Sequence, residues 1–215
     1  MASQRIIPVI STTTIGSGTT IAGSSGFAKT SVGASVAVGM RVVGAGFPFL
    51  SVVNVIAADA FTIMHEETKK VLYNTSGSLG SASVQVGVFA SAAYAAGDAL
   101  GFPFRFSMSL IRQLVLTDPT KAINGVSLGV FRAPFTEIAD NAAWTPAAAD
   151  LKNLLGVIPL SAKIVSTNAN VFQRPEDSLP FDCGGLLQVY GQLVIDAGTP
   201  TFTSISDVVL EIQGE

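Results

Sequence analysis

The chain has 215 residues, of which 48% are hydrophobic and 13% are charged, and its formal net charge is −3. Ordinary globular domains contain about 25% charged residues, and intrinsic disorder requires low hydrophobicity together with high charge. The composition therefore excludes a disordered chain, and the negative net charge argues against a protein dedicated to binding nucleic acid.

The mean hydropathy of +0.52 is high for a soluble protein and raises the question of membrane segments. The longest uncharged stretch runs over residues 71–97, and Asn, Ser and Gly interrupt it repeatedly. It contains no unbroken run of about 18 apolar residues, and the first residues lack the apolar core of a signal peptide. We therefore expect no membrane partner, and we interpret the surplus apolar surface as buried in an assembly.

The first predicted domain spans residues 1–89 and combines an N-terminal arm with a small β domain. Residues 11–31 are rich in Thr, Ser and Gly, which favours an extended arm or two short strands. Farther along, strands are predicted at 51–56 and 60–63, joined around Ala58 and Asp59, and residues 83–89 alternate as another strand.

The second predicted domain spans residues 90–215 and is a jelly-roll-like β-sandwich, because seven or eight strands in about 125 residues is the size of that fold. Its strands are predicted at about 103–110, 112–117, 126–131, 156–160, 163–167, 186–195 and 207–213. The strongest helix signal lies between them, where Thr145 can cap a helix that starts at Pro146 and ends by Gly156. The predicted fold class is therefore all-β throughout.

Residues that could support catalysis or bind a metal are few. His65 is the only histidine and Cys183 the only cysteine, so the chain cannot form an intramolecular disulfide or a zinc site of the usual Cys/His type. A Ser–His–Asp triad would require His65, but its charged neighbours favour a solvated loop. Cys183 has no second histidine to activate it, so we expect a buried or semi-buried thiol near a turn. We predict no catalytic, cofactor-binding or metal-binding residues, no cofactor and no enzymatic activity.

Two further patterns bear on function. Paired carboxylates could serve a glycosidase, but Asp140 and the pair at 176–177 lie in turn-like sequence, and the aromatic residues that line sugar clefts are scarce. Phe102, Phe104 and Phe106 alternate at a spacing of two, which places them on one face of a strand. We interpret this row as hydrophobic core.

Two sets of short passages resemble proteins of tailed bacteriophages. The first runs from 39–48 through 52–56 to 61–63 and resembles a small β module common in their structural proteins. The second comprises residues 94–98, 115–118, 131–135, 139–143, 156–159, 190–194 and 198–202. Together they cover most of residues 39–213 and resemble a virion protein of the capsid decoration, or cement, type. This resemblance implies a non-enzymatic β-rich subunit on the capsid exterior, assembled in the cytoplasm of the bacterial host.

The leading hypothesis is a decoration protein that stabilises the shell by bridging major capsid protein subunits. It associates with itself, as a trimer in preference to a dimer, and binds neither nucleic acid nor membrane. Residues 1–84 carry a charge of +2 and residues 85–215 a charge of −5, so we assign docking to 1–89 and the sandwich to the rest. The alternatives are a tail, neck or fibre component, and a carbohydrate-binding or carbohydrate-active module for the host surface.

Overall fold

The structure is a computed structural model, and the regular secondary structure in the part of the chain that it describes consists almost entirely of β-strands. The described residues are 2–6, 13–14, 18–20, 23–34, 36–43, 47–48, 50–66, 68–73, 85–86, 93–138, 141–175, 180–186, 188–202 and 208–215. The strand ladders between them are antiparallel. The predicted all-β fold is therefore confirmed, as expected for Val-, Ile-, Thr- and Phe-rich runs separated by Gly and Pro.

The chain divides into two compact units, which we call the larger and the smaller unit. The larger unit comprises residues 1–8 and 91–215, and the smaller unit comprises residues 9–90. The first eight residues thus differ from the predicted N-terminal arm. Strand β1 (Ala2–Ile6) pairs with the last strand of the chain over five residues, because that sheet edge offers main-chain partners that an isolated arm lacks.

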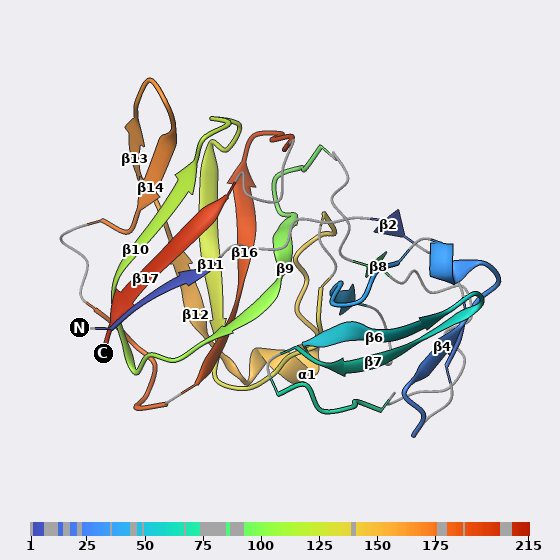
Figure 1. Ribbon diagram of the computed structural model, residues 1–215. Helices are drawn as coiled ribbons and strands as arrows, with labels where there is room; N and C mark the ends of the chain where they lie inside the picture. Colours follow the sequence, from blue (N-terminus) through green and yellow to red (C-terminus); the bar gives the residue numbers. More distant parts are fainter. Residues whose placement is uncertain are drawn as a thin grey trace. The chain divides into compact units, whose positions relative to one another are not determined.

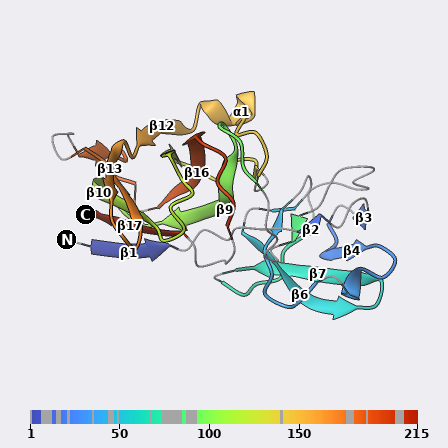
Figure 2. The same cartoon turned by 90° about the horizontal axis from the view of Figure 1, so that it is seen from above.

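The larger unit contains two sheets, which Figure 2 shows as two layers. Besides β1, its strands are β9 (Ala99–Phe106), β10 (Leu110–Asp118), β11 (Gly125–Phe131), β12 (Leu154–Pro159), β13 (Ala162–Val165), β14 (Asn170–Gln173), β15 (Phe181–Asp182), β16 (Val189–Ala197) and β17 (Val209–Gly214). One sheet, the β10 sheet, has the order β1-β17-β10-β14-β13, with β15 also paired to β10. The other, the β11 sheet, has the order β12-β11-β16-β9 (Figure 1).

Most of the long strands lie close to where the sequence predicts them, whereas β1, β14 and β15 were not predicted. The hydrophobic periodicity explains the difference. In β10, Ile111, Leu114 and Leu116 are fully buried while their neighbours at 112 and 113 are exposed. In contrast, β14 and β15 are too short to show a clear alternation.

Strand β11 is buried on both faces, because Phe135, Ile138 and Trp144, from the segment that follows it, lie against the outer face of its sheet. Six consecutive residues of β11, from Val126 to Phe131, are buried. The ring of Phe131 stacks on Phe135 with centroids 4.0 Å apart, and it meets Trp144 edge-on at 6.3 Å. These rings form a second, smaller apolar layer outside the sandwich core.

The predicted helix is present but shorter than expected. Helix α1 spans only Ala148–Leu151, and Ala147, not Thr145, occupies its N-cap position without a side-chain cap hydrogen bond. The Thr145 hydroxyl instead donates to the carbonyl of Ala143 at 3.3 Å. Gly156 does not end the helix, since β12 has already begun at Leu154 and pairs with β11. The start of β12, which pairs with β11, therefore limits the helix to a single turn.

The smaller unit contains two small sheets and one 3-10 turn, η1 (Val32–Ala34). Its strands are β2 (Thr13–Thr14), β3 (Thr19–Thr20), β4 (Gly26–Ala28), β5 (Val42–Val43), β6 (Ser51–Ala57), β7 (Ala60–His65) and β8 (Gln85–Val86). The hairpin of β6 and β7 confirms the two strands predicted around Ala58 and Asp59. In the Thr-rich segment, the short strands β2 to β4 match the strand interpretation rather than the extended arm.

Three phenylalanine rings form the centre of the smaller unit's core. Phe27 and Phe61 lie with centroids 5.0 Å apart, and Phe47 packs against both at 5.9 and 6.4 Å. Beside this core, the buried Arg41 forms an ion pair with Glu66, with Nη1 and Oε2 separated by 2.7 Å. The smaller unit thus has a hydrophobic core of its own.

Candidate functional site

Exposed apolar side chains of the larger unit gather in one short stretch of the chain. The large hydrophobic residues that the structure describes there as exposed are Leu151, Val157, Ile164 and Val165, with exposed fractions of 50, 46, 53 and 69%. They lie in or next to α1, β12 and β13. Ile164 and Val165 are neighbours in one strand and therefore point to opposite faces of their sheet.

Both sheets of the larger unit end at this stretch. Strand β12 is the last strand of the β11 sheet, and β13 is the last strand of the β10 sheet. Residues 160–161 join the two strands directly, which keeps the two sheet edges close together (Figure 2). Open edges carry main-chain donors and acceptors that another chain can pair with.

The opposite edge of the β11 sheet is covered. There the amide of Ala99 in β9 donates to the carbonyl of Ala142 at 2.8 Å, and the amide of Asn141 donates to the carbonyl of Ala99 at 2.9 Å. The amide of Trp144 donates to the carbonyl of Gly97 at 2.7 Å. The segment 141–144 therefore takes the place of a further strand, and the accessible edge of this sheet is β12.

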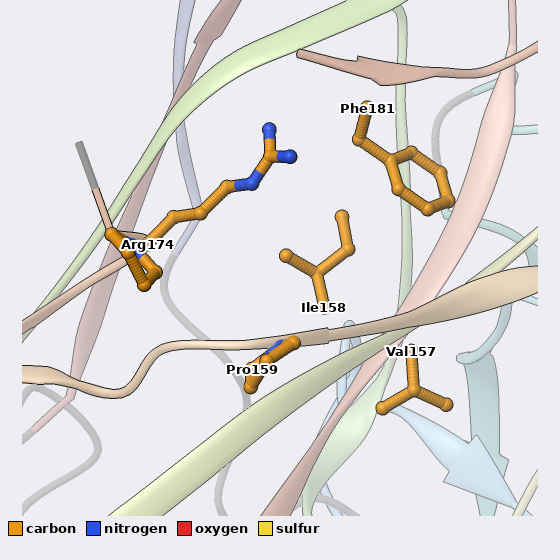
Figure 3. Close-up of a pocket in the computed structure, with 6 residues that line it drawn as sticks. Val157, Ile158, Pro159, Arg174 and Phe181 are labelled. Atoms are coloured by element: carbon orange, nitrogen blue, oxygen red, sulfur yellow. The ribbon is translucent and has the colours of Figure 1, made fainter. Parts of the chain in front are cut away.

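A shallow pocket of about 170 Å³ lies beside the β12 edge (Figure 3). The described residues that line it are Val157, Ile158, Pro159, Arg174, Pro175 and Phe181. Figure 3 shows the guanidinium of Arg174 on one side of the pocket and the ring of Phe181 on the other, with Ile158 between them. Apart from Arg174, the named lining side chains are apolar.

Arg174 is the charged residue among the described residues that line this pocket. Its Nη1 donates to the carbonyl of Ile111 at 3.2 Å, and burial lowers the pKa of Arg174 from its ordinary value. An arginine side chain nevertheless stays protonated at neutral pH. The described lining residues include no acid, nucleophile or imidazole.

The two reactive residues singled out in the sequence lie in different units. His65 occupies the last position of β7 rather than a loop, and its Nδ1 accepts from the amide of Thr68 at 3.3 Å. Cys183 is fully buried, as predicted, and its amide donates to the carbonyl of Ser109 at 2.8 Å. Burial and the neighbouring carboxylate of Asp182 raise the pKa of Cys183 to about 11, so the thiol is protonated and unreactive at neutral pH.

The phenylalanine row and the acidic residues considered in the sequence analysis are only partly covered by the described residues. Phe104 and Phe106 are buried with ring centroids 6.0 Å apart, which confirms them as core. The side chain of Phe102, together with Asp140 and residues 176–177, lies outside the described part of the chain.

Sequence reasoning missed a buried polar contact on the outer face of the β11 sheet. Gln192 is fully buried, and its Nε2 donates to the carbonyls of Gly101 at 3.0 Å and Ile138 at 2.8 Å. Gln192 thereby ties the segment that follows β11 to the sheet. A polar residue within a strand-like run was the only signal, and such a residue is ordinarily read as exposed.

Comparison with known proteins finds no match to this chain. No family model matches the chain, and no curated protein or solved structure matches it. Within the described ranges, none of the helices has the length and apolar character needed to cross a membrane. The same residues contain no cluster of three or more His, Cys, Asp or Glu side chains that could hold a metal ion.

Proposed function

We propose that this chain is a structural virion protein that decorates and stabilises the capsid shell of a tailed bacteriophage by bridging major capsid protein subunits. In this proposal the protein is not an enzyme, needs no cofactor, associates with itself and lies on the capsid exterior. The resemblance of residues 39–213 to phage structural proteins suggests it. A jelly-roll-like topology for residues 90–215 belongs to the same proposal, beyond the all-β fold described above.

The observation that carries the proposal is the edge strand β12 with its exposed Val157 and the adjoining Arg174 pocket. An edge strand beside an apolar pocket suits binding to an extended or flat protein surface. The sequence assigned docking to residues 1–89. We now propose that β12 shares that role.

The first test is the copy number of the chain in virions of the phage that encodes it. Quantitative mass spectrometry with labelled peptides would measure its ratio to the major capsid protein. Decoration predicts on the order of hundreds of copies, since shells repeat their symmetry positions many times, whereas a ring in a tail or neck predicts about six or twelve. A low count would favour the tail or neck alternative, and absence from virions would overturn both.

The second test is attachment to capsids that lack the protein. We expect the purified chain to co-sediment with them, and we expect Val157→Lys to weaken attachment about tenfold or more by placing a charge on the β12 edge. Gln113→Lys is a matched control, because Gln113 is exposed in β10 of the larger unit and lies outside both segments proposed to dock. Equal attachment of both variants would remove the β12 edge from the docking surface.

A further inference from the structure

Strand β13 is an edge strand of the β10 sheet. Its residues Lys163, Ile164 and Val165 are exposed, and within the described residues no strand pairs with its outer side. Figure 1 shows the β13–β14 hairpin at the border of its sheet. Natural proteins commonly block an edge of this kind with a lysine or a proline.

Lys163 does not act as such a block, because its ammonium group contacts its own unit. Its Nζ lies 3.2 Å from Oδ1 of Asn124 and 5.4 Å from the centroid of the Phe172 ring. The neighbouring edge strand β12 differs in this respect, since it contains Pro159, which has no amide to donate. Between the edge strands β12 and β13, β13 is therefore the better template for pairing.

Bonded and non-bonded residue pairs alternate along the β13–β14 hairpin. This alternation shows which main-chain groups of β13 face away from β14. The amide of Ser166 donates to the carbonyl of Ala169, and Ile164 is the register partner of Val171. Because bonded positions alternate in an antiparallel ladder, Ile164 bonds inward to β14. The amides and carbonyls of Lys163 and Val165 consequently point away from the sheet.

We propose that β13 is an interface with a second copy of this chain, in which the two β13 strands pair antiparallel about a twofold axis at Ile164. In this register Lys163 of each copy lies opposite Val165 of the other, so each outward amide and carbonyl of the strand acquires a partner. The two Ile164 side chains face each other as a non-hydrogen-bonded pair. The two β10 sheets thereby become one continuous sheet.

Charge and self-complementarity favour this register and this partner. A twofold axis at Lys163 would set two lysines directly opposite each other, and like charges in that position are destabilising. An axis at Ile164 instead pairs two exposed aliphatic side chains. Each copy offers the same amides and carbonyls to the other. An isologous contact requires this self-complementarity.

The contact is small, because β13 has only four residues. Stable interfaces bury about 1,200 Å² or more, so this pairing by itself makes a weak dimer or supports a larger assembly. The inference rests on the self-association included in the proposed function. It does not rest on attachment to a capsid.

Disulfide trapping of the full-length chain tests the pairing. Facing residues of a non-hydrogen-bonded antiparallel pair have Cα atoms about 4.5 Å apart, within the range for a disulfide. We therefore expect Ile164→Cys to form a covalent dimer under mild oxidation about tenfold faster than Val38→Cys. Val38 is exposed to 61% in the smaller unit, and the buried Cys183 is common to both variants. Equal rates for the two variants would overturn the proposal.

Analytical ultracentrifugation over a concentration series provides the second readout. We expect wild type to associate as concentration rises and Ile164→Lys to stay monomeric, since it places two ammonium groups at the axis; Val55→Lys should behave as wild type. If wild type associates and Ile164→Lys associates equally, the β13 interface is wrong while self-association stands. If wild type remains monomeric, the β13 interface and the proposed self-association are both wrong. Capsid attachment is tested separately by co-sedimentation.

Discussion

Gly129 and Trp144 show how a single residue sets the packing of the larger unit's outer layer. A Cβ atom on Gly129 would clash with Cζ2 of Trp144, so the indole occupies space that only glycine leaves free. Gly129 is the register partner of Gln192, whose amide donates to the carbonyl of Ile138. The glycine therefore allows the sheet and the indole to pack together.

Replacing this glycine should destabilise the larger unit. We expect Gly129→Ala to lower the free energy of unfolding by about 1–3 kcal/mol, because the new methyl group overpacks the site. Trp144 is the only tryptophan, so its fluorescence during denaturant unfolding reports on the larger unit.

A double-mutant cycle with Trp144→Phe, followed by circular dichroism, controls this prediction. The smaller ring gives up the atoms nearest to the new methyl group, so the added cost of Gly129→Ala should shrink in the Trp144→Phe background. Gly26→Ala is the reference substitution, since its Cβ would meet only Ser24 Oγ at 3.5 Å. An unchanged cost in the cycle would show that the indole is not the obstacle.

At the scale of elements, β1 is the strand whose position carries the most information. It lies at the edge of the β10 sheet, where Ala2 is the register partner of Gly214. The side chain of Gln4 also joins it to β9 and the residues after it, since Nε2 donates to the carbonyl of Arg105 at 3.4 Å and Oε1 accepts from the amide of Ser107 at 3.2 Å. The strand thus protects β17 from becoming an open edge.

Deletion of residues 1–6 should lower the thermal midpoint of the larger unit and promote aggregation, because β17 would then expose its main-chain groups. Gln4→Ala, which keeps the strand, should cost only about 1 kcal/mol for its two hydrogen bonds. Thermal unfolding followed by Trp144 fluorescence, together with light scattering, measures both effects. A deletion no worse than Gln4→Ala would contradict a structural role for β1.

For the whole molecule, the main feature is the presence of two units with separate cores. The smaller unit buries Phe27, Phe47 and Phe61 together, while the larger unit has its own sandwich core and outer layer. The low charge of the chain and its apolar edge strands favour binding to other proteins. In the proposals above, these partners are the capsid and a second copy of the chain.

The smaller unit should therefore fold by itself. We expect residues 9–90, produced alone, to show a β-type circular dichroism spectrum and cooperative thermal unfolding, because their core is complete. Phe61→Ala in the same fragment should remove about 3–5 kcal/mol and abolish the transition. A gradual melt of the unsubstituted fragment would show that the core depends on the rest of the chain.

The amino-acid sequence alone determined the local features of this protein. Alternation predicted the all-β class, the β6–β7 hairpin and the burial of Phe104 and Phe106, because a strand's period of two is visible within a few residues. The burial of Cys183 was also predicted correctly. The absence of catalytic chemistry and the phage function stay predictions.

Only the tertiary structure decided which distant segments meet. It placed β1 beside β17, set Gln192 opposite Gly129, and, among the described residues, made β12 and β13 edge strands. The physical reason is that main-chain hydrogen bonds between strands are the same for every residue except proline. Strand partners and edges therefore depend on how the whole chain packs, and a local pattern of side chains does not encode them.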